Sequence, residues 1–150
     1  MSTSAEAAYR LRLAQGFLNE ARQDLTLGRW RAAVDNSQLC AENAAKAALA
    51  LVGPVGRTHN PALGLRQALE AGRFSSEHEQ QVKSLIECAE LLGPDVHTKT
   101  DYGDESAGLT PWELFRAEDA RQALEIAERA CALAEQLVLG SGRTLASHLG

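Results

Sequence analysis

Residues 117–138 read AEDARQALEIAERACALAEQLV, and this stretch decides the fold. Its apolar positions recur at alternating intervals of three and four residues, which places them on one side of an α-helix. Glu118 and Asp119, near the start, suit the positive end of a helix dipole. The segment therefore predicts a long amphipathic helix. The apolar stripe consists of Ala117, Ala120, Leu124, Ala127, Cys131, Ala134 and Val138.

The same periodicity predicts further helices upstream. Gly, Pro and a capping-box pattern at Ser76 and Glu79 mark their limits. Asn60 and Pro61 are a good N-cap and first residue for a short helix. The predicted helices cover residues 7–25, 30–52 and 61–71, and a fourth follows the capping box at Ser76 and Glu79 and ends at Leu92.

The 150 residues suffice for one domain with a core. Hydrophobic content of 45% and charged content of 23% are ordinary for a globular protein, and sparse β-branched residues disfavour a sheet. We therefore predict an all-α fold, an up-and-down four-helix bundle with one additional short helix. The bundle is expected over residues 1–139, with residues 140–150 as a flexible C-terminal tail.

Charge and cysteine content limit the classes of function. A net charge of −5 argues against broad, sequence-independent nucleic-acid binding, although a local basic cluster is compatible with it. Cys40, Cys88 and Cys131 lie on apolar helical faces without a C-x-x-C pair, which predicts buried, reduced thiols. No segment resembles a signal peptide or a membrane span. A cytoplasmic protein without membrane association or cofactor is the expectation.

Residues 93–110 read GPDVHTKTDYGDESAGLT and interrupt the helical pattern. We predict a polar loop here, and long loops in compact domains are often functional. His97 supplies an imidazole whose charge changes near neutral pH, Lys99 a cation, and Tyr102 a hydroxyl and a stacking face. These three residues are the candidate catalytic group. The loop ends at a capping-box pattern that contains Thr110 and Glu113.

Two other interpretations of this loop remain open. Acidic residues outnumber Lys99, so a phosphate site there needs charge from Arg57 or from a second subunit. Without that additional charge, the loop is a solvated connection in which Asp101 caps a turn and Tyr102 packs on the bundle. Alternatively, carboxylates and an imidazole ligate a metal, although no structural-zinc spacing supports that. The residues of that alternative are Asp95, His97, Asp101 and Asp104.

Glu42 and Lys46 lie four residues apart on the second predicted helix, in the order that favours an exposed ion pair. His59 follows this helix and is expected to cap the short helix or to bridge loops.

The last predicted helix carries apolar residues beyond its main stripe, namely Ile126, Leu133 and Leu137. A surplus apolar face predicts a partner helix, most simply from a second copy of the chain. Trp112 and Phe115 are candidates to anchor that contact. A homodimer is therefore expected.

Several fragments, in this order, resemble the HEPN domain family over roughly residues 5–139. The resemblance implies a helical bundle, a homodimer and an RNA or nucleotide context. It also implies a binding role for Arg57, His59, Asp101, Glu42 and Lys46. As the alternative to an exposed Glu42–Lys46 pair, the resemblance implies a polar network of Glu42 with Gln38 beneath the loop, in which every group would need a partner. The fragments are Gly28-Arg-Trp-Arg-Ala-Ala-Val34, then Gln38, Glu42 and Lys46 at intervals of four, Thr58-His59-Asn60, and Asp101-Tyr102 ahead of Glu118-Asp119-Ala120.

Active members of that family carry an R-x4-6-H pair that cleaves RNA without metal. The corresponding segment of this chain is His97-Thr-Lys-Thr-Asp101-Tyr102, and no histidine follows within it. Two strings elsewhere fit the spacing, Arg73 with His78 and Arg143 with His148, a number close to chance.

The resemblance predicts a dimeric HEPN-like module in an RNA- or nucleotide-related system, without the standard ribonuclease pair. In toxin–antitoxin systems such modules are paired with a minimal nucleotidyltransferase, which is therefore a possible partner. The alternative is a metal-independent ribonuclease using His97, Lys99 and Tyr102 at the dimer cleft. A third possibility is a structural or interaction protein whose loop has no chemistry of its own.

Overall fold

The computed structural model describes residues 2–149, with side chains through residue 140. This part of the chain forms seven helices and no strand longer than an isolated bridge. The helices are α1 (Thr3–Thr26), α2 (Trp30–Ala50), α3 (Pro61–Glu70), α4 (Glu79–Leu91), α5 (Pro94–Tyr102), α6 (Pro111–Leu114) and α7 (Ala117–Leu149). In the part described, no helix has the length and apolarity that a membrane crossing requires.

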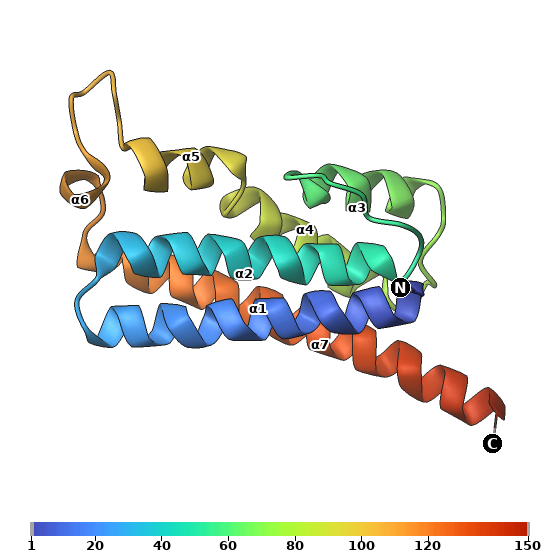
Figure 1. Ribbon diagram of the computed structural model, residues 1–150. Coiled ribbons are helices and arrows are strands. Elements are labelled where there is room, and N and C mark those ends of the chain that lie inside the picture. The colour runs from blue at the N-terminus through green and yellow to red at the C-terminus, as the bar shows by residue number, and fades with distance from the viewer. Residues whose placement is uncertain (1, 150) are drawn as a thin grey trace.

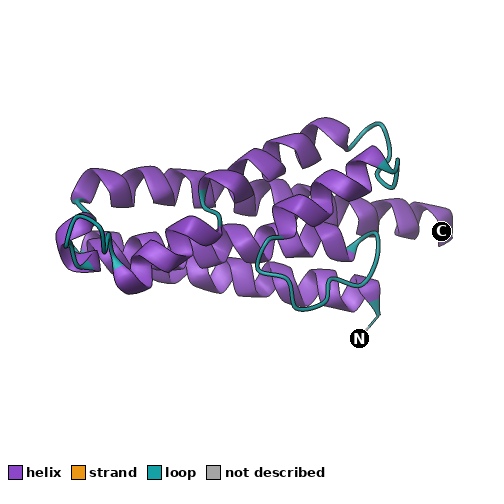
Figure 2. Cartoon of the chain, turned by 90° about the horizontal axis from the view of Figure 1, so that it is seen from above, coloured by secondary structure: helices purple, strands orange, loops and turns teal. Residues whose placement is uncertain are grey.

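The helices form the predicted up-and-down bundle. Helices α1 and α2 run antiparallel, α7 lies along both, and α4 and α5 follow one another to make the fourth rod (Figure 1). Helix α3 is the additional short helix and packs beside α2 and α4. Seen from above, loops gather at the two ends of the rods (Figure 2).

Helix α2 is the central element, because it contacts every other helix of the bundle. Its alanines, including Ala33, Ala44 and Ala48, are fully buried and let neighbouring backbones approach closely. Helices α3 and α5 cover the side of α2 that α1 and α7 leave open. The polar side chains of α2 are therefore enclosed as well.

The prediction of an irregular loop over residues 93–110 is wrong for its first half, because Pro94–Tyr102 is the helix α5. Pro94 begins the helix, where a missing N–H has no consequence. Asp95 pairs with Lys99 at 3.1 Å, and His97 lies 3.9 Å from Asp101, both at the i,i+4 spacing that supports a helix.

The second half of that stretch is a tight turn. Asp104 and Leu109 exchange backbone hydrogen bonds of 2.9 Å, and Gly103 and Gly108 have positive φ. The Asp104 carboxylate accepts hydrogen bonds from the Ser106 hydroxyl at 2.7 Å and from the Ala107 N–H at 3.1 Å. These bonds lower the pKa of Asp104, the Ser106 hydroxyl contributing most.

The two predicted capping boxes have different outcomes. The box at Thr110 and Glu113 is present, but it begins the separate short helix α6 rather than the last long helix. The box at Ser76 and Glu79 is absent, since α4 begins after His78 without a side-chain cap. Residues 75–78 form their own turn instead, in which the His78 N–H donates to the Ser75 carbonyl.

Thr110→Ala is expected to raise the pKa of Glu113, because hydrogen bonds from the Thr110 side chain and backbone lower that pKa. Loss of an N-cap costs about 1 kcal/mol. The Glu113 contribution to stability is present above its unfolded pKa and is lost as the pH falls through its lower folded pKa. NMR titration of Glu113 in both proteins measures the change, and an unaltered pKa in Thr110→Ala contradicts it.

Helix α7 does not leave the surplus apolar face that the sequence suggested. Leu137 is fully buried, and Ile126 and Leu133 are partly buried against the core of the same chain. The reason is that α7 packs on α1, α2 and α4 at once, so more than one of its sides is covered. The prediction of a surplus face is therefore wrong, and α7 gives no support for a dimer.

The helix continues to Leu149, while the side chains of residues 141–150 lie outside the described part, so the flexibility of that tail stays a prediction.

Candidate functional site

The three candidate catalytic residues do not share one side of α5. His97 lies against Asp101, at 3.9 Å, whereas Lys99 pairs with Asp95 at 3.1 Å. Positions two apart on an α-helix are rotated by about 200°, so His97 and Lys99 point to nearly opposite sides. The Tyr102 side chain is 65% exposed. The structure therefore separates the imidazole from the amine within one chain.

The alternative interpretations of this region are also changed. The carboxylate that organises the turn is that of Asp104, and Tyr102 does not pack on the bundle. Within the part of the chain that the structure describes, no three His, Cys, Asp or Glu side chains converge as a metal site.

The structure instead draws attention to a row of polar residues on α2, which we call the α2 polar face: Asp35, Gln38, Glu42 and Lys46. Their spacing of three and four residues places them on one side of the helix. Gln38 and Lys46 are buried, and Glu42 is nearly so. Buried polar groups in a helical core need partners, and those partners come from α5 and from the loop before α3.

Asp35 connects this face to α5. The fully buried Thr100 hydroxyl lies 3.3 Å from the Asp35 carboxylate and donates 2.6 Å to the His97 carbonyl, the shorter of its two bonds. Arg31 pairs with the other Asp35 oxygen at 3.7 Å. Neither Asp35 nor Thr100 was a candidate from sequence. The sequence does place Asp35 one turn before Gln38 on the same side of α2. That position could be interpreted only once α5 was known to be a helix that packs there.

Glu42 and Lys46 form the predicted ion pair, at 3.3 Å, but the prediction that the pair is exposed is wrong. The side chains are only 11% and 8% exposed, because α3 and α5 cover this side of α2. The other Glu42 oxygen lies 3.9 Å from the exposed His59 ring, so His59 bridges the loop to α2. Gln38 is buried beside them, and its carbonyl oxygen has no hydrogen-bond partner in the part described.

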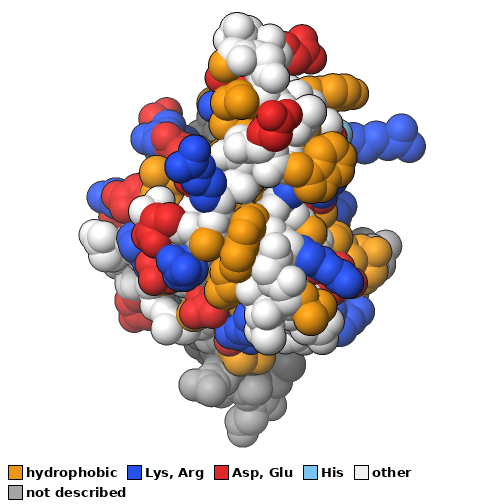
Figure 3. Space-filling model, turned by 90° about the vertical axis from the view of Figure 1, so that its left-hand side faces the viewer, with side chains coloured by type: hydrophobic (Ala, Val, Ile, Leu, Met, Phe, Trp, Pro, Cys, Tyr) orange, Lys and Arg blue, Asp and Glu red, His pale blue; other side chains and the backbone are white. Residues whose placement is uncertain are grey.

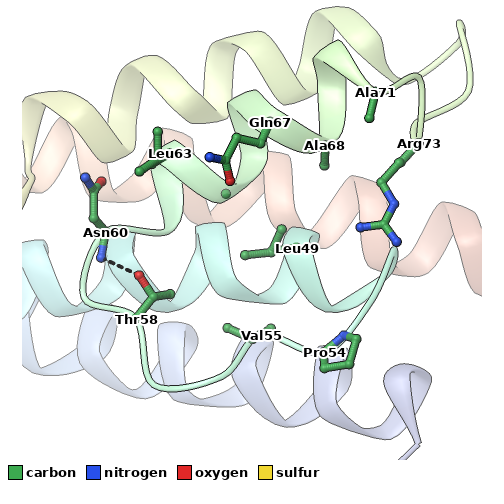
Figure 4. A pocket seen from close by; sticks show the side chains of 11 residues that line it. Leu49, Pro54, Val55, Thr58, Asn60, Leu63, Gln67, Ala68, Ala71 and Arg73 are labelled. Atoms are coloured by element: carbon green, nitrogen blue, oxygen red, sulfur yellow. Dashed lines mark hydrogen bonds between the residues drawn. The ribbon is translucent and has the colours of Figure 1, made fainter.

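A pocket of about 540 Å³ lies under α3, between that helix, the end of α2 and the loop that contains Thr58 (Figure 4). Its floor is apolar, with Leu49 and Val55, and Gln67 points into it. Arg73 lies at one end, beside Gly53, and makes no ion pair within residues 2–140. Arg57 is exposed on the same loop and does not line the pocket.

The two chance matches to the ribonuclease spacing do not form a site. The His78 ring bonds the Ser75 hydroxyl at 3.2 Å, whereas Arg73 lines the pocket under α3. The side chains of Arg143 and His148 lie outside the described residues.

The three cysteines are buried and free, as predicted. The Cys40 thiol on α2 donates to the Ala127 carbonyl at 3.6 Å, and the neighbouring Cys131 thiol on α7, together with burial, raises the pKa of Cys40. Burial raises the pKa of Cys88. These thiols belong to the core between helices.

The bundle, with a polar central helix bridged by α5 and by the loop before α3, defines a class of small all-α domain. The sequence profile of the HEPN domain matches residues 7–137, and the chain belongs to that family. Its fold is similar to the crystal structure of TT1696 from Thermus thermophilus, with a TM-score of 0.66 and 23% sequence identity over 91% of this chain and 99% of that chain. No protein with a curated description matches the chain.

Proposed function

We propose that this HEPN domain is a binding module in an RNA- or nucleotide-related system and does not use the family's ribonuclease pair. The observation that carries the proposal is the surroundings of His97. The charged neighbour of its imidazole is Asp101, where an active HEPN centre needs an arginine.

The charges of α5 support the same conclusion. Lys99 is paired with Asp95, and the His97 ring lies 3.9 Å from Asp101, so both basic side chains of this helix have an acid beside them. A phosphoryl transition state needs uncompensated positive charge held close to a general acid or base. Helix α5 on its own does not provide that combination.

The polar side chains of α2 are better suited to holding the module together. Asp35 holds α5 through the buried Thr100 hydroxyl, and Glu42 faces the His59 ring of the loop before α3 at 3.9 Å, so both connections meet this side of α2. We propose that Glu42, Lys46, His59, Arg57 and Asp101 support a binding surface on this side rather than catalysis. In this proposal the module is a homodimer, and its protein partner is a minimal nucleotidyltransferase of the toxin–antitoxin type.

The purified protein is expected to leave a structured RNA intact, even at high protein concentration and with metal chelated. His97→Ala and the matched variant Lys99→Ala are expected to behave as the wild type, because neither side chain adjoins a second catalytic group. Gel electrophoresis of the RNA over time measures the result.

Chelator-resistant cleavage that His97→Ala abolishes would overturn the proposal and establish the ribonuclease alternative. In that case Lys99→Ala and a Tyr102→Phe variant would show whether the three residues act together across two subunits. Cleavage that persists in every variant indicates a contaminating nuclease. The protein is then purified further until its specific activity is constant, and the comparison of the variants is repeated.

A further inference from the structure

The end of the bundle where the α1–α2 turn meets α6 carries a second pocket, of about 570 Å³. We call it the aromatic–arginine pocket, and its volume falls in the range of small-molecule sites. Viewed from this end, the molecule shows hydrophobic side chains through the middle of the face, with both basic and acidic side chains around them (Figure 3). The lining residues are Gly28, Arg29, Trp30, Arg31, Ala32, Trp112 and Phe115.

Trp112 is the most exposed large hydrophobic side chain of the described residues, at 73%. The Arg31 guanidinium lies 5.6 Å from the Trp112 ring centroid, in the geometry of a cation–π contact. Arg31 is also held by Asp35 at 3.7 Å, so the arginine is fixed from both sides. The ring therefore stands in the solvent with one face supported by a cation and its remaining surface free.

The charged side chains that line this pocket are basic, although the chain as a whole is acidic. The Arg29 side chain has no hydrogen-bond or ion-pair partner among residues 2–140. Arg29 and Arg31 are the charged residues that line the pocket, and no carboxylate lines it. Arg31 is paired with Asp35 at 3.7 Å. Within residues 2–140 the Arg29 guanidinium is therefore the basic group of the lining that is not already paired with an acid.

We propose that the aromatic–arginine pocket binds a nucleotide unit, with the base stacked on Trp112 and the phosphate held by Arg29. Aromatic faces with neighbouring arginines are the chemistry that recognises a planar base carrying a negative charge. The positive end of the α2 dipole lies at the same place and adds to the attraction, but the side chains of the pocket carry the argument. The inference rests on the proposed function, and it adds to the surface proposed there a second binding region, on residues that no ribonuclease motif contains.

A nucleotide unit has two possible sources, a free nucleotide and a single-stranded RNA, and one titration separates them. The probe is fluorescein-labelled octauridylate at low salt, followed by anisotropy, with unlabelled UMP as competitor. Saturable binding is expected. Displacement by UMP assigns the pocket to free nucleotides, whereas resistance to UMP assigns it to an RNA strand.

Trp112→Leu is expected to weaken binding by about tenfold or more, the effect of losing one base–aromatic stack. Arg29→Gln is expected to weaken binding and to lower the slope of log affinity against log salt by about 0.7, since one phosphate contact is lost. The matched control is Tyr9→Leu, because Tyr9 is also exposed and stacked by an arginine, Arg12 at 6.0 Å, yet lines none of the pockets described above. Tyr9→Leu is expected to bind as the wild type.

Three results would overturn the inference. These are no binding by the wild type, wild-type affinity in Trp112→Leu, and equal weakening in Tyr9→Leu. Trp112 could instead be a contact between subunits, and size-exclusion chromatography of Trp112→Leu tests that role. A change from dimer to monomer in this variant is a fourth result that would overturn the inference. RNA cleavage by the wild type would contradict the proposed function alone, so the two failures are distinguishable.

Discussion

Gly103→Ala is expected to destabilise the protein by about 3 kcal/mol, through a positive-φ backbone and a steric clash together. Gly103 has φ 71° and ψ −144°, a region that essentially only glycine adopts. A Cβ atom there would lie 2.1 Å from the Leu109 carbonyl oxygen and 2.7 Å from the Thr110 carbonyl carbon. Both are backbone atoms of the same turn, so no side-chain rotation relieves the contact.

Thermal unfolding followed by circular dichroism measures this loss, which corresponds to a fall of about 6–12 °C in Tm for a domain of this size. The matched control is Gly108→Ala in the same turn. Gly108 also has a positive φ, of 69°, but an added Cβ meets no atom within 4 Å. Gly108→Ala is therefore expected to lower the free energy of unfolding by only about 1 kcal/mol, the cost of the left-handed backbone conformation for alanine. An equal loss in both variants would show that crowding at Gly103 does not matter.

The turn at Gly103 also positions the aromatic–arginine pocket, because it places Thr110 at the start of α6 and so holds Trp112 opposite Arg31. Gly103→Ala therefore disturbs the pocket as well as the stability. For this reason Gly103→Ala and Trp112→Leu are both expected to weaken binding of the same ligand.

The long helices could be predicted from sequence because their apolar spacing is a local property. Helix α7 follows the alternating stripe, and α2 begins at Trp30 as expected. Helix α5 was missed because it has almost no apolar stripe of its own: among its residues only Thr100 is buried. Its helical signals are Pro94 at the start and the two i,i+4 pairs, and these looked like a cluster of functional groups instead.

The candidate site shows the same limit. Local spacing placed Glu42 and Lys46 correctly as an ion pair, but whether the pair is exposed depends on α3 and α5, which pack on α2 from elsewhere in the chain. In the same way, Trp112 and Arg31 are far apart in sequence and meet only in the folded bundle. Their shared pocket therefore could not be predicted from periodicity.

The burial of the Glu42–Lys46 pair has a large expected consequence. Lys46→Met is expected to destabilise the protein by about 3 kcal/mol, because it leaves a nearly buried carboxylate without its partner. The remaining neighbour of Glu42 is the exposed His59 ring at 3.9 Å, which is too distant to replace the Lys46 amine at 3.3 Å. Urea unfolding followed by circular dichroism measures the change in the free energy of unfolding.

Two further variants make the test of Lys46 specific. Lys99→Met removes an exposed i,i+4 pair with Asp95 and is expected to cost about 0.5 kcal/mol or less. The double variant Glu42→Met with Lys46→Met should recover most of the loss, since replacing both members of a buried pair with apolar side chains is often neutral. A Lys46→Met variant as stable as Lys99→Met would contradict the prediction, because it would mean that water reaches Glu42 and replaces the Lys46 amine.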